Sequence, residues 1–214
     1  EQPFHGLTMI FRETEAGLFT SHSYKFSPTH STFIVECPPE TWLRAGLDKM
    51  SDADTCAYLA EVFKPDLCGQ PLLSNNFVKW LNFPLVKNKR WYHKNIVLLG
   101  DALHTAHFSI GSGTKLALED SIALADSFAR CRTVEESLPE FERARKPVVE
   151  KFQAAALQSL AWLENVKEHL YLDPVPFTYR LMTRSRRVGF NRIKRADPEF
   201  ASQYDAWRKA QPQA

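Results

Sequence analysis

The sequence predicts a mixed fold, of the α+β or α/β class, with an antiparallel sheet near its start and helices over most of the remainder. Three segments within residues 1–40 are rich in β-branched and aromatic residues. A short apolar run at 95–99 has the length of a buried strand. The stretches that follow this run have the helical spacing of apolar residues, which completes the mixed pattern.

The predicted sheet is an antiparallel meander of three strands. They cover residues 4–14, 17–26 and 31–37, and turn-forming residues separate them. Because proline cannot donate to a sheet ladder, the pair Pro38-Pro39 is expected to end the sheet.

Helical elements are predicted from capping residues and from apolar spacing. Ser51 is placed to cap a helix that ends before Pro65. Further helices are predicted over 113–130 and over most of 139–169, with Pro147 as a break or kink.

Two segments between these helices are predicted to be extended. Residues 77–86 read as extended chain that Pro84 interrupts. Residues 95–99 are apolar apart from Asn95 and have polar flanks, as expected of a strand that is buried on both faces in a parallel sheet.

Composition and charge narrow the function classes. Of the 214 residues, 44% are hydrophobic and 24% are charged, as in globular rather than disordered or fibrous chains. The 27 basic and 25 acidic residues leave a net charge of +2, which gives no general argument for nucleic acid or membrane binding. No apolar run approaches membrane-spanning length and no signal-peptide pattern is present. We therefore expect a soluble, cytoplasmic protein.

The cysteines are scattered and form no Cys-x-x-Cys pair. We expect them to be buried small side chains in a reducing compartment. They are Cys37, Cys56, Cys68 and Cys131.

One stretch carries most of the chemical information. The apolar run ends in Gly100-Asp101, and Gly111-Ser112-Gly113 leads into the next predicted helix. A carboxylate at the end of a strand can accept hydrogen bonds from a ribose or polyol, and glycines let the backbone approach a planar ring. The N–H groups of the first helical turn favour negative charge. Such a site would suit an anionic reduced flavin.

This stretch resembles the second FAD signature of the flavin-dependent aromatic hydroxylases, which have the p-hydroxybenzoate hydroxylase fold. The usual form is Gly-Asp-Ala-Ala-His, a Pro, Gly-x-Gly, then Glu-Asp-Ala and Leu-Ala. The sequence departs from it at Phe108, where the family has Pro, and at Lys115, where Asn is frequent. The positions in register are Gly100, Asp101, Ala102, His104, Gly111, Gly113, Ala117, Glu119, Asp120, Leu124 and Ala125.

The residues that depart from the usual form resemble those of one branch of that family, which contains salicylyl-CoA 5-hydroxylase and 2-aminobenzoyl-CoA monooxygenase. Residues 107–117 resemble this branch, as do residues 33–37 with the nearby Trp42 and 45–48. Phe141-Glu142-x-x-Arg145-x-Pro147 matches the later Tyr-Glu-x-x-Arg-x-Pro of the family. The resemblance covers most of residues 4–170.

The resemblance implies a substrate-domain sheet, the C-terminal part of a Rossmann-like FAD-binding domain, and C-terminal helices. The expected domains are 1–90, 91–130 and 131–214. The chain has no Gly-x-Gly-x-x-Gly, with which the family holds the ADP half of FAD. We therefore expect the C-terminal portion of a longer hydroxylase, whose partner is the missing N-terminal half of the same polypeptide. Alone, this stretch is expected to be inactive and unable to hold FAD.

The implied function is hydroxylation of an aromatic substrate, including an aryl-CoA thioester, by a monooxygenase that uses FAD and NAD(P)H. In the family the oxygen is transferred from a flavin C4a-hydroperoxide, and the protein supplies binding and a dry pocket. Asp101 would bind the ribityl chain, and His107 or Phe108 would face flavin or substrate. No residue is assigned a catalytic role beyond these candidates. The implied cofactor-binding residues are Gly100, Asp101, Ile110, Gly111, Ser112, Gly113 and Thr114.

Other interpretations of the same residues remain open. Asp101, His104 and His107 have spacing that could suggest a metal site, but no fourth ligand is indicated, so we expect none. His104 would then hold the loop. Glu119 and Asp120 are either first-turn acids of the helix or structural contacts between domains.

The basic tail also allows two interpretations. It is either a solvated helical face or domain contact, or a site for the phosphates of CoA or NADPH, since arginine suits phosphate oxygens. Its residues are Arg180, Arg184, Arg186, Arg187, Arg192, Lys194 and Arg195. As a whole-chain alternative, the protein is a non-catalytic member of the same fold that binds a lipid or protein partner.

Overall fold

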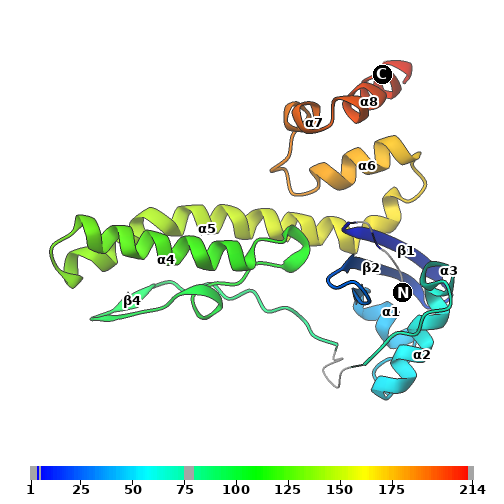
Figure 1. The fold of residues 1–214 in the computed structure, drawn as a ribbon, viewed down its shortest axis with the longest axis horizontal. Helices are drawn as coiled ribbons and strands as arrows, with labels where there is room; N and C mark the ends of the chain where they lie inside the picture. Colours follow the sequence, from blue (N-terminus) through cyan, green and yellow to red (C-terminus); the bar gives the residue numbers. More distant parts are fainter. Residues whose placement is uncertain (1–3, 5, 75–79, 212–214) are drawn as a thin grey trace. The chain divides into compact units, whose positions relative to one another are not determined.

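The three predicted strands form one antiparallel sheet in the computed structural model, which describes residues 4, 6–74 and 80–211 (Figure 1). They are β1 (Thr8–Thr14), β2 (Gly17–Lys25) and β3 (Ser31–Glu36), with β2 in the centre. The predicted meander is therefore confirmed. Gly17 has a φ of +136°, and a Cβ there would overlap the side chain of Thr41, so the first turn requires glycine.

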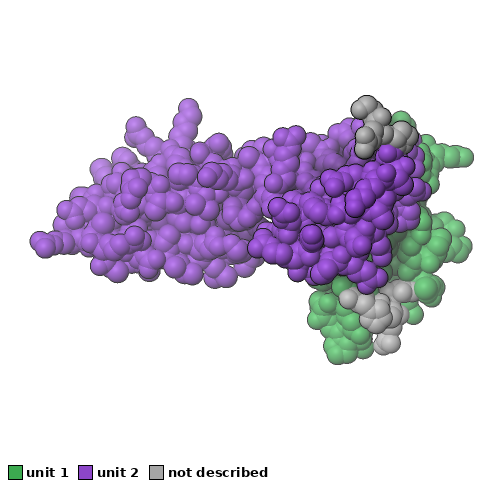
Figure 2. Space-filling view, turned by 90° about the horizontal axis from the view of Figure 1, so that it is seen from above, with its two compact units in different colours: residues 1–81 green, residues 82–214 purple. Residues whose placement is uncertain are grey.

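Three helices follow the sheet: α1 (Pro39–Arg44), α2 (Asp52–Val62) and α3 (Lys64–Leu67). The predicted cap is present, because Ser51 Oγ accepts a hydrogen bond from the N–H of Asp54 at 3.2 Å. These elements lie in the first of two compact units, residues 1–81, drawn in green in Figure 2. Its core consists of Ile10, Phe19, Leu47, Leu59, Phe63 and Leu67.

The second unit, residues 82–214, begins with irregular chain and a small hairpin. Of the stretch predicted to be extended at 77–86, residues 77–79 lie outside the described residues, and residues 80–86 form no strand. The hairpin pairs β4 (Tyr92–His93) with β5 (Ile96–Val97). The predicted strand buried on both faces is wrong for this structure, since among the described strands β5 pairs with β4 alone, and Ile96 is 66% exposed. An apolar run indicates that burial is favourable, but burial on both faces also requires elements that cover each face of the sheet.

Two long helices dominate the second unit, α4 (Gly113–Arg130) and α5 (Val134–Glu164), and they pack side by side (Figure 1). The bounds of α4 agree with the prediction. Pro147 does not break α5, which continues through it to Glu164. A proline removes one backbone hydrogen bond, and packing of the surrounding residues outweighs this cost. The core between hairpin, loop and helices consists of Trp91, Leu103, Leu116, Phe141 and Val149.

The second unit ends in a 3-10 turn, η3 (Val166–His169), and three helices: α6 (Pro174–Thr183), α7 (Phe190–Ala196) and α8 (Pro198–Ala210). The rings of Tyr179 and Tyr204 stack with centroids 3.7 Å apart, which joins α6 to α8. None of the described helices is long and apolar enough to cross a membrane. The predicted domain boundaries at residues 90 and 130 stay predictions.

The prediction that all four cysteines are buried is wrong. Cys68 is exposed in a left-handed conformation, with a φ of +46°, and the other three are half-buried. Burial, together with the charges of Glu40 and Glu36, raises the pKa of the Cys37 thiol to about 12. Scattered spacing identified free thiols but could not place them in the core.

Candidate functional site

The loop between β5 and α4 contains two 3-10 turns, η1 (Gly100–Ala102) and η2 (Phe108–Ile110). Gly100 and Gly111 have φ values of +58° and +57°, which favour glycine. A Cβ on Gly100 would also lie 3.4 Å from Ala117 Cβ, a close contact with α4. The two glycines of the motif therefore set the path by which the loop turns onto the helix.

The predicted cofactor-binding residues fall into two places along this loop. Asp101 is exposed in η1, which packs against α4, and its carboxylate forms no hydrogen bond or ion pair within the described part of the chain. Residues 110–114 form the entry to α4. Ser112 is buried and its Oγ donates to the carbonyl of Ile110 at 3.1 Å, whereas Thr114 is exposed.

The first turn of α4 is open to an incoming group. Ser112 makes no side-chain cap, and the turn contains no acidic residue. A Cβ built on Gly113 would meet no atom within 4 Å. The first N–H groups of a helix lack intrahelical partners and lie at the positive end of its dipole. This turn can therefore donate to an acceptor that approaches closely.

His107 and Phe108 lie side by side, with ring centroids 4.5 Å apart. Both rings also lie close to the ring of Phe83: its centroid is 6.0 Å from that of His107 and 5.0 Å from that of Phe108. His107 Nδ1 accepts a hydrogen bond from the N–H of Ser109 at 3.3 Å, which fixes the start of η2. The two candidate substrate-facing residues thus form one aromatic cluster.

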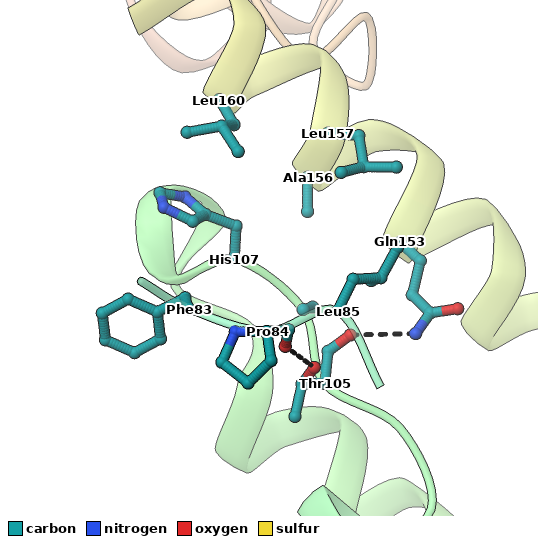
Figure 3. Close-up of a pocket in the computed structure, with 10 residues that line it drawn as sticks. Phe83, Pro84, Leu85, Thr105, His107, Gln153, Ala156, Leu157 and Leu160 are labelled. Atoms are coloured by element: carbon teal, nitrogen blue, oxygen red, sulfur yellow. Dashed lines mark hydrogen bonds between the residues drawn. The ribbon is translucent and has the colours of Figure 1, made fainter. Parts of the chain in front are cut away.

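A small pocket of about 80 Å³ lies beside His107 (Figure 3). Leu157 and Leu160 of α5 form its wall opposite Phe83. The polar groups of the pocket bond to its own walls, since Thr105 Oγ1 donates to the carbonyl of Pro84 at 2.6 Å and Gln153 Nε2 donates to that of Thr105 at 2.9 Å. The pocket is therefore an apolar recess whose walls are held by hydrogen bonds.

A buried ionic network lies beneath this loop. His104 Nε2 is 2.7 Å from Asp120 Oδ2, and Arg145 Nε donates to Asp120 Oδ1 at 2.9 Å. Arg145 also donates to Glu119 Oε2 at 3.2 Å and to the carbonyl of Leu116 at 3.3 Å. Asp120 has no exposed surface. The network joins the loop, α4 and α5 through a single carboxylate.

These contacts decide between the interpretations that the sequence left open for Glu119 and Asp120. Glu119 and Asp120 are not first-turn acids, because α4 begins at Gly113. They are structural, and a hydrogen bond from Lys115, with help from Arg145, lowers the pKa of Glu119. His104 holds the loop, as expected. No cluster that could hold a metal ion occurs among the described residues.

Sequence reasoning did not pair Arg145 with Asp120. A signal was present, because each residue lies on the apolar face of its helix. Asp120 follows Leu116 by four residues, and Arg145 is four residues from both Phe141 and Val149. A charge on a buried face requires a partner of opposite charge, so the pairing of Asp120 with Arg145 could have been proposed from the sequence.

Arg184 fixes η2 from outside the loop. Its guanidinium donates to the carbonyl of Ser109 at 2.8 Å, to Ser159 Oγ at 2.9 Å and to the carbonyl of Leu181 at 2.7 Å. These acceptors belong to η2, α5 and α6. Arg184 therefore connects the basic tail to the loop that carries His107.

Replacing Arg184 with alanine is expected to loosen η2, since hydrogen bonds to a charged group contribute about 1.5–3 kcal/mol. We expect amide exchange at residues 109–112 to rise about tenfold or more, measured by hydrogen–deuterium exchange with mass spectrometry. Arg186→Ala is the matched control, because Arg186 is exposed and two residues away. Unchanged protection in Arg184→Ala would contradict the assignment.

The chain is similar in sequence to several known proteins. No family model matches the chain. The chain is 39% identical to salicyloyl-CoA 5-hydroxylase from Streptomyces sp, over 95% of this chain and 41% of that protein. It is 37% identical to protodeoxyviolaceinate monooxygenase from Chromobacterium violaceum, over 87% of this chain and 50% of that protein.

A third relative is the 3-hydroxy-4-methyl-anthranilyl-[aryl-carrier protein] 5-monooxygenase of Streptosporangium sibiricum. It is 38% identical over 76% of this chain and 42% of its own length. The chain thus spans half or less of the length of each of these three relatives.

The fold is shared with PqsL of Pseudomonas aeruginosa, whose crystal structure is described as that of a probable FAD-dependent monooxygenase. The match has a TM-score of 0.53 at 19% identity and covers 76% of this chain and 48% of PqsL. The sequence matches confirm the resemblance that was inferred from the motif at residues 100–125. Over most of its length the chain is therefore similar to part of each of these monooxygenases, and it shares its fold with a probable FAD-dependent monooxygenase.

Proposed function

We propose that this chain supplies the flavin-facing loop and the substrate-side sheet of an FAD-dependent monooxygenase that uses NAD(P)H to hydroxylate an aromatic substrate. One observation carries the proposal: Asp101, whose carboxylate has no partner within the described part of the chain, and the uncapped first turn of α4 belong to elements that pack together. A flavin needs both, an acceptor for its ribityl hydroxyls and donors for its ring.

The residues present fit this cofactor. Asp101 would accept hydrogen bonds from the ribityl chain, and the backbone of residues 110–114 would line the pyrimidine edge of the ring. Gly113 leaves open space where a side chain would obstruct the ring. The positive end of α4 would favour the reduced, anionic form. When bound, FAD supplies the redox and oxygen-transfer chemistry.

The protein residues would bind the substrate, orient it and exclude water. His107 and Phe108 form the aromatic surface next to the loop, and the recess beside His107 is apolar. We propose that they hold the substrate ring against the flavin-facing backbone. A static, water-poor position of this kind is what oxygen transfer to a ring demands.

We propose an aryl thioester as the substrate class. Two relatives are named for substrates in which an aromatic acid is carried by CoA or by a carrier protein. The branch-like residues 107–117 lie in the loop and at the start of α4. A thioester leaves the ring free for hydroxylation while its long arm extends away from the site.

The outer face of α4 is proposed to pack against a further part of the flavin-binding domain. Leu118 and Ile122 are each 62% exposed on this face, and Ile96 of β5 is exposed as well. Apolar side chains at this spacing mark a contact surface. The length of the relatives that this chain does not span would include the occupant.

The test is the visible absorption spectrum of the full-length protein, with the released chromophore identified. We expect bound FAD, and we expect Asp101→Ala to weaken its binding roughly 10–100-fold, as for loss of a charged hydrogen bond. Asp101→Asn keeps the shape without the charge, and Asp126→Ala removes an exposed carboxylate of α4 as the matched control. A colourless full-length protein that rejects added FAD would overturn the proposal and favour a non-catalytic binding module.

A further inference from the structure

Residues 180–195 contain seven basic side chains and no acidic one. The whole chain has a net charge of only +2, so this segment holds an excess of positive charge that acidic residues in the rest of the chain offset. The segment covers the end of α6, the connection to α7 and nearly all of α7. A local concentration of positive charge, in a chain whose remaining residues are on balance acidic, indicates an anionic partner.

Most of these cations are exposed and have no acidic partner. Arg186, Arg187, Arg192, Lys194 and Arg195 are exposed, and none of them forms an ion pair with a carboxylate of the described chain. Basic residues elsewhere in this unit often do, as Arg143 does with Glu140 and Lys146 with Glu142. The segment is therefore not a solvated face of alternating charges.

The structure also orients part of this segment. The guanidinium of Arg187 lies 3.5 Å from the centroid of the Phe152 ring, and Lys115 Nζ lies 5.3 Å from the same centroid. Stacking fixes the guanidinium and leaves its N–H groups free to donate at the edge. Arg184, three residues earlier, is bonded to the carbonyl of Ser109. The segment therefore begins at the flavin-facing loop and extends away from it along α7.

We propose that this basic segment binds the phosphate groups of the coenzyme A portion of the substrate. The inference rests on the proposed function, in which an aryl thioester is hydroxylated. In such a substrate the pantetheine arm separates the ring from the 3′-phosphate and pyrophosphate. A ring held at residues 107–108 requires a phosphate site that is connected to the loop but displaced from it, and the segment meets both conditions. Arginine, which predominates here, binds phosphate oxygens in pairs.

The experiment compares two thioesters of the same acid in the full-length protein, 2-hydroxybenzoyl-CoA and 2-hydroxybenzoyl-pantetheine, which lacks all phosphates. Binding is measured by calorimetry, without turnover. In Arg186→Ala/Arg192→Ala/Arg195→Ala we expect the CoA thioester to bind at least about tenfold more weakly and the pantetheine thioester to bind unchanged. Added salt should weaken only the CoA thioester.

The matched control removes three exposed cations elsewhere, in Lys25→Ala/Lys49→Ala/Arg132→Ala, and should bind both thioesters as the wild type does. The inference would be overturned if the test variant bound both thioesters more weakly to the same degree, or if it bound both as tightly as the wild type does. So would a defect confined to NADPH or to an aryl-carrier protein, because the segment would then serve that partner. A wild-type protein that holds FAD but binds both thioesters equally refutes only this inference, whereas one without FAD refutes the proposed function.

Discussion

Replacing Asp120 with alanine is expected to lower the free energy of unfolding by about 3–5 kcal/mol, because it leaves Arg145 buried without its main partner. Of its partners among the described residues, Arg145 would keep Glu119 and the Leu116 carbonyl, at 3.2 Å and 3.3 Å. His104 would lose its bond as well, so the loop should loosen with the helices. Urea unfolding of the full-length protein, monitored by circular dichroism, measures the change.

Two further variants separate lost charge pairing from lost packing. Asp126→Ala removes an exposed carboxylate from the same helix and should change stability by less than about 0.5 kcal/mol. Combining Asp120→Ala with Arg145→Met removes both charges and should recover part of the loss, since an apolar pair is tolerated better than a lone charge. A cost below about 1 kcal/mol for Asp120→Ala would show that the network contributes little.

Phe63→Ala is expected to destabilise the first unit by about 3–5 kcal/mol. Its ring is fully buried and meets Phe33 edge to face, with centroids 5.1 Å apart. Because Trp91, Trp162 and Trp207 lie in the second unit, tryptophan fluorescence does not isolate this core, and hydrogen–deuterium exchange of peptides within residues 6–74 measures the change instead. Phe26→Ala is the control, because Phe26 is 65% exposed and should cost little. If both substitutions cost the same, the assigned core is wrong.

Elements that depend on local sequence were predictable. The meander follows from β-branched residues between turns, and the cap at Ser51 follows from its hydroxyl and the acids after it. The bounds of α4 follow from the glycine at its start and from its apolar spacing. Gly100 and Gly111 lie in left-handed conformations, which glycine adopts without a steric cost, and their role in cofactor binding stays a prediction.

Features that depend on distant partners were not predictable. The run at 95–99 needed a larger sheet with both faces covered in order to be buried, and Pro147 was accommodated by packing along α5. The link between Asp120 and Arg145 joins residues 25 apart and exists only because α4 packs on α5. Spacing along one helix cannot show which residue of another helix will face it.

The separation of the two hydrophobic cores along the chain has a consequence for synthesis on the ribosome. The first core and the residues packed on it lie between Phe4 and Trp80, and the second between Trp91 and Phe152. Because domains fold as units while the chain emerges, the first core can close before α5 has left the exit tunnel. The nascent chain then exposes less apolar surface to chaperones at one time than a chain with both cores open.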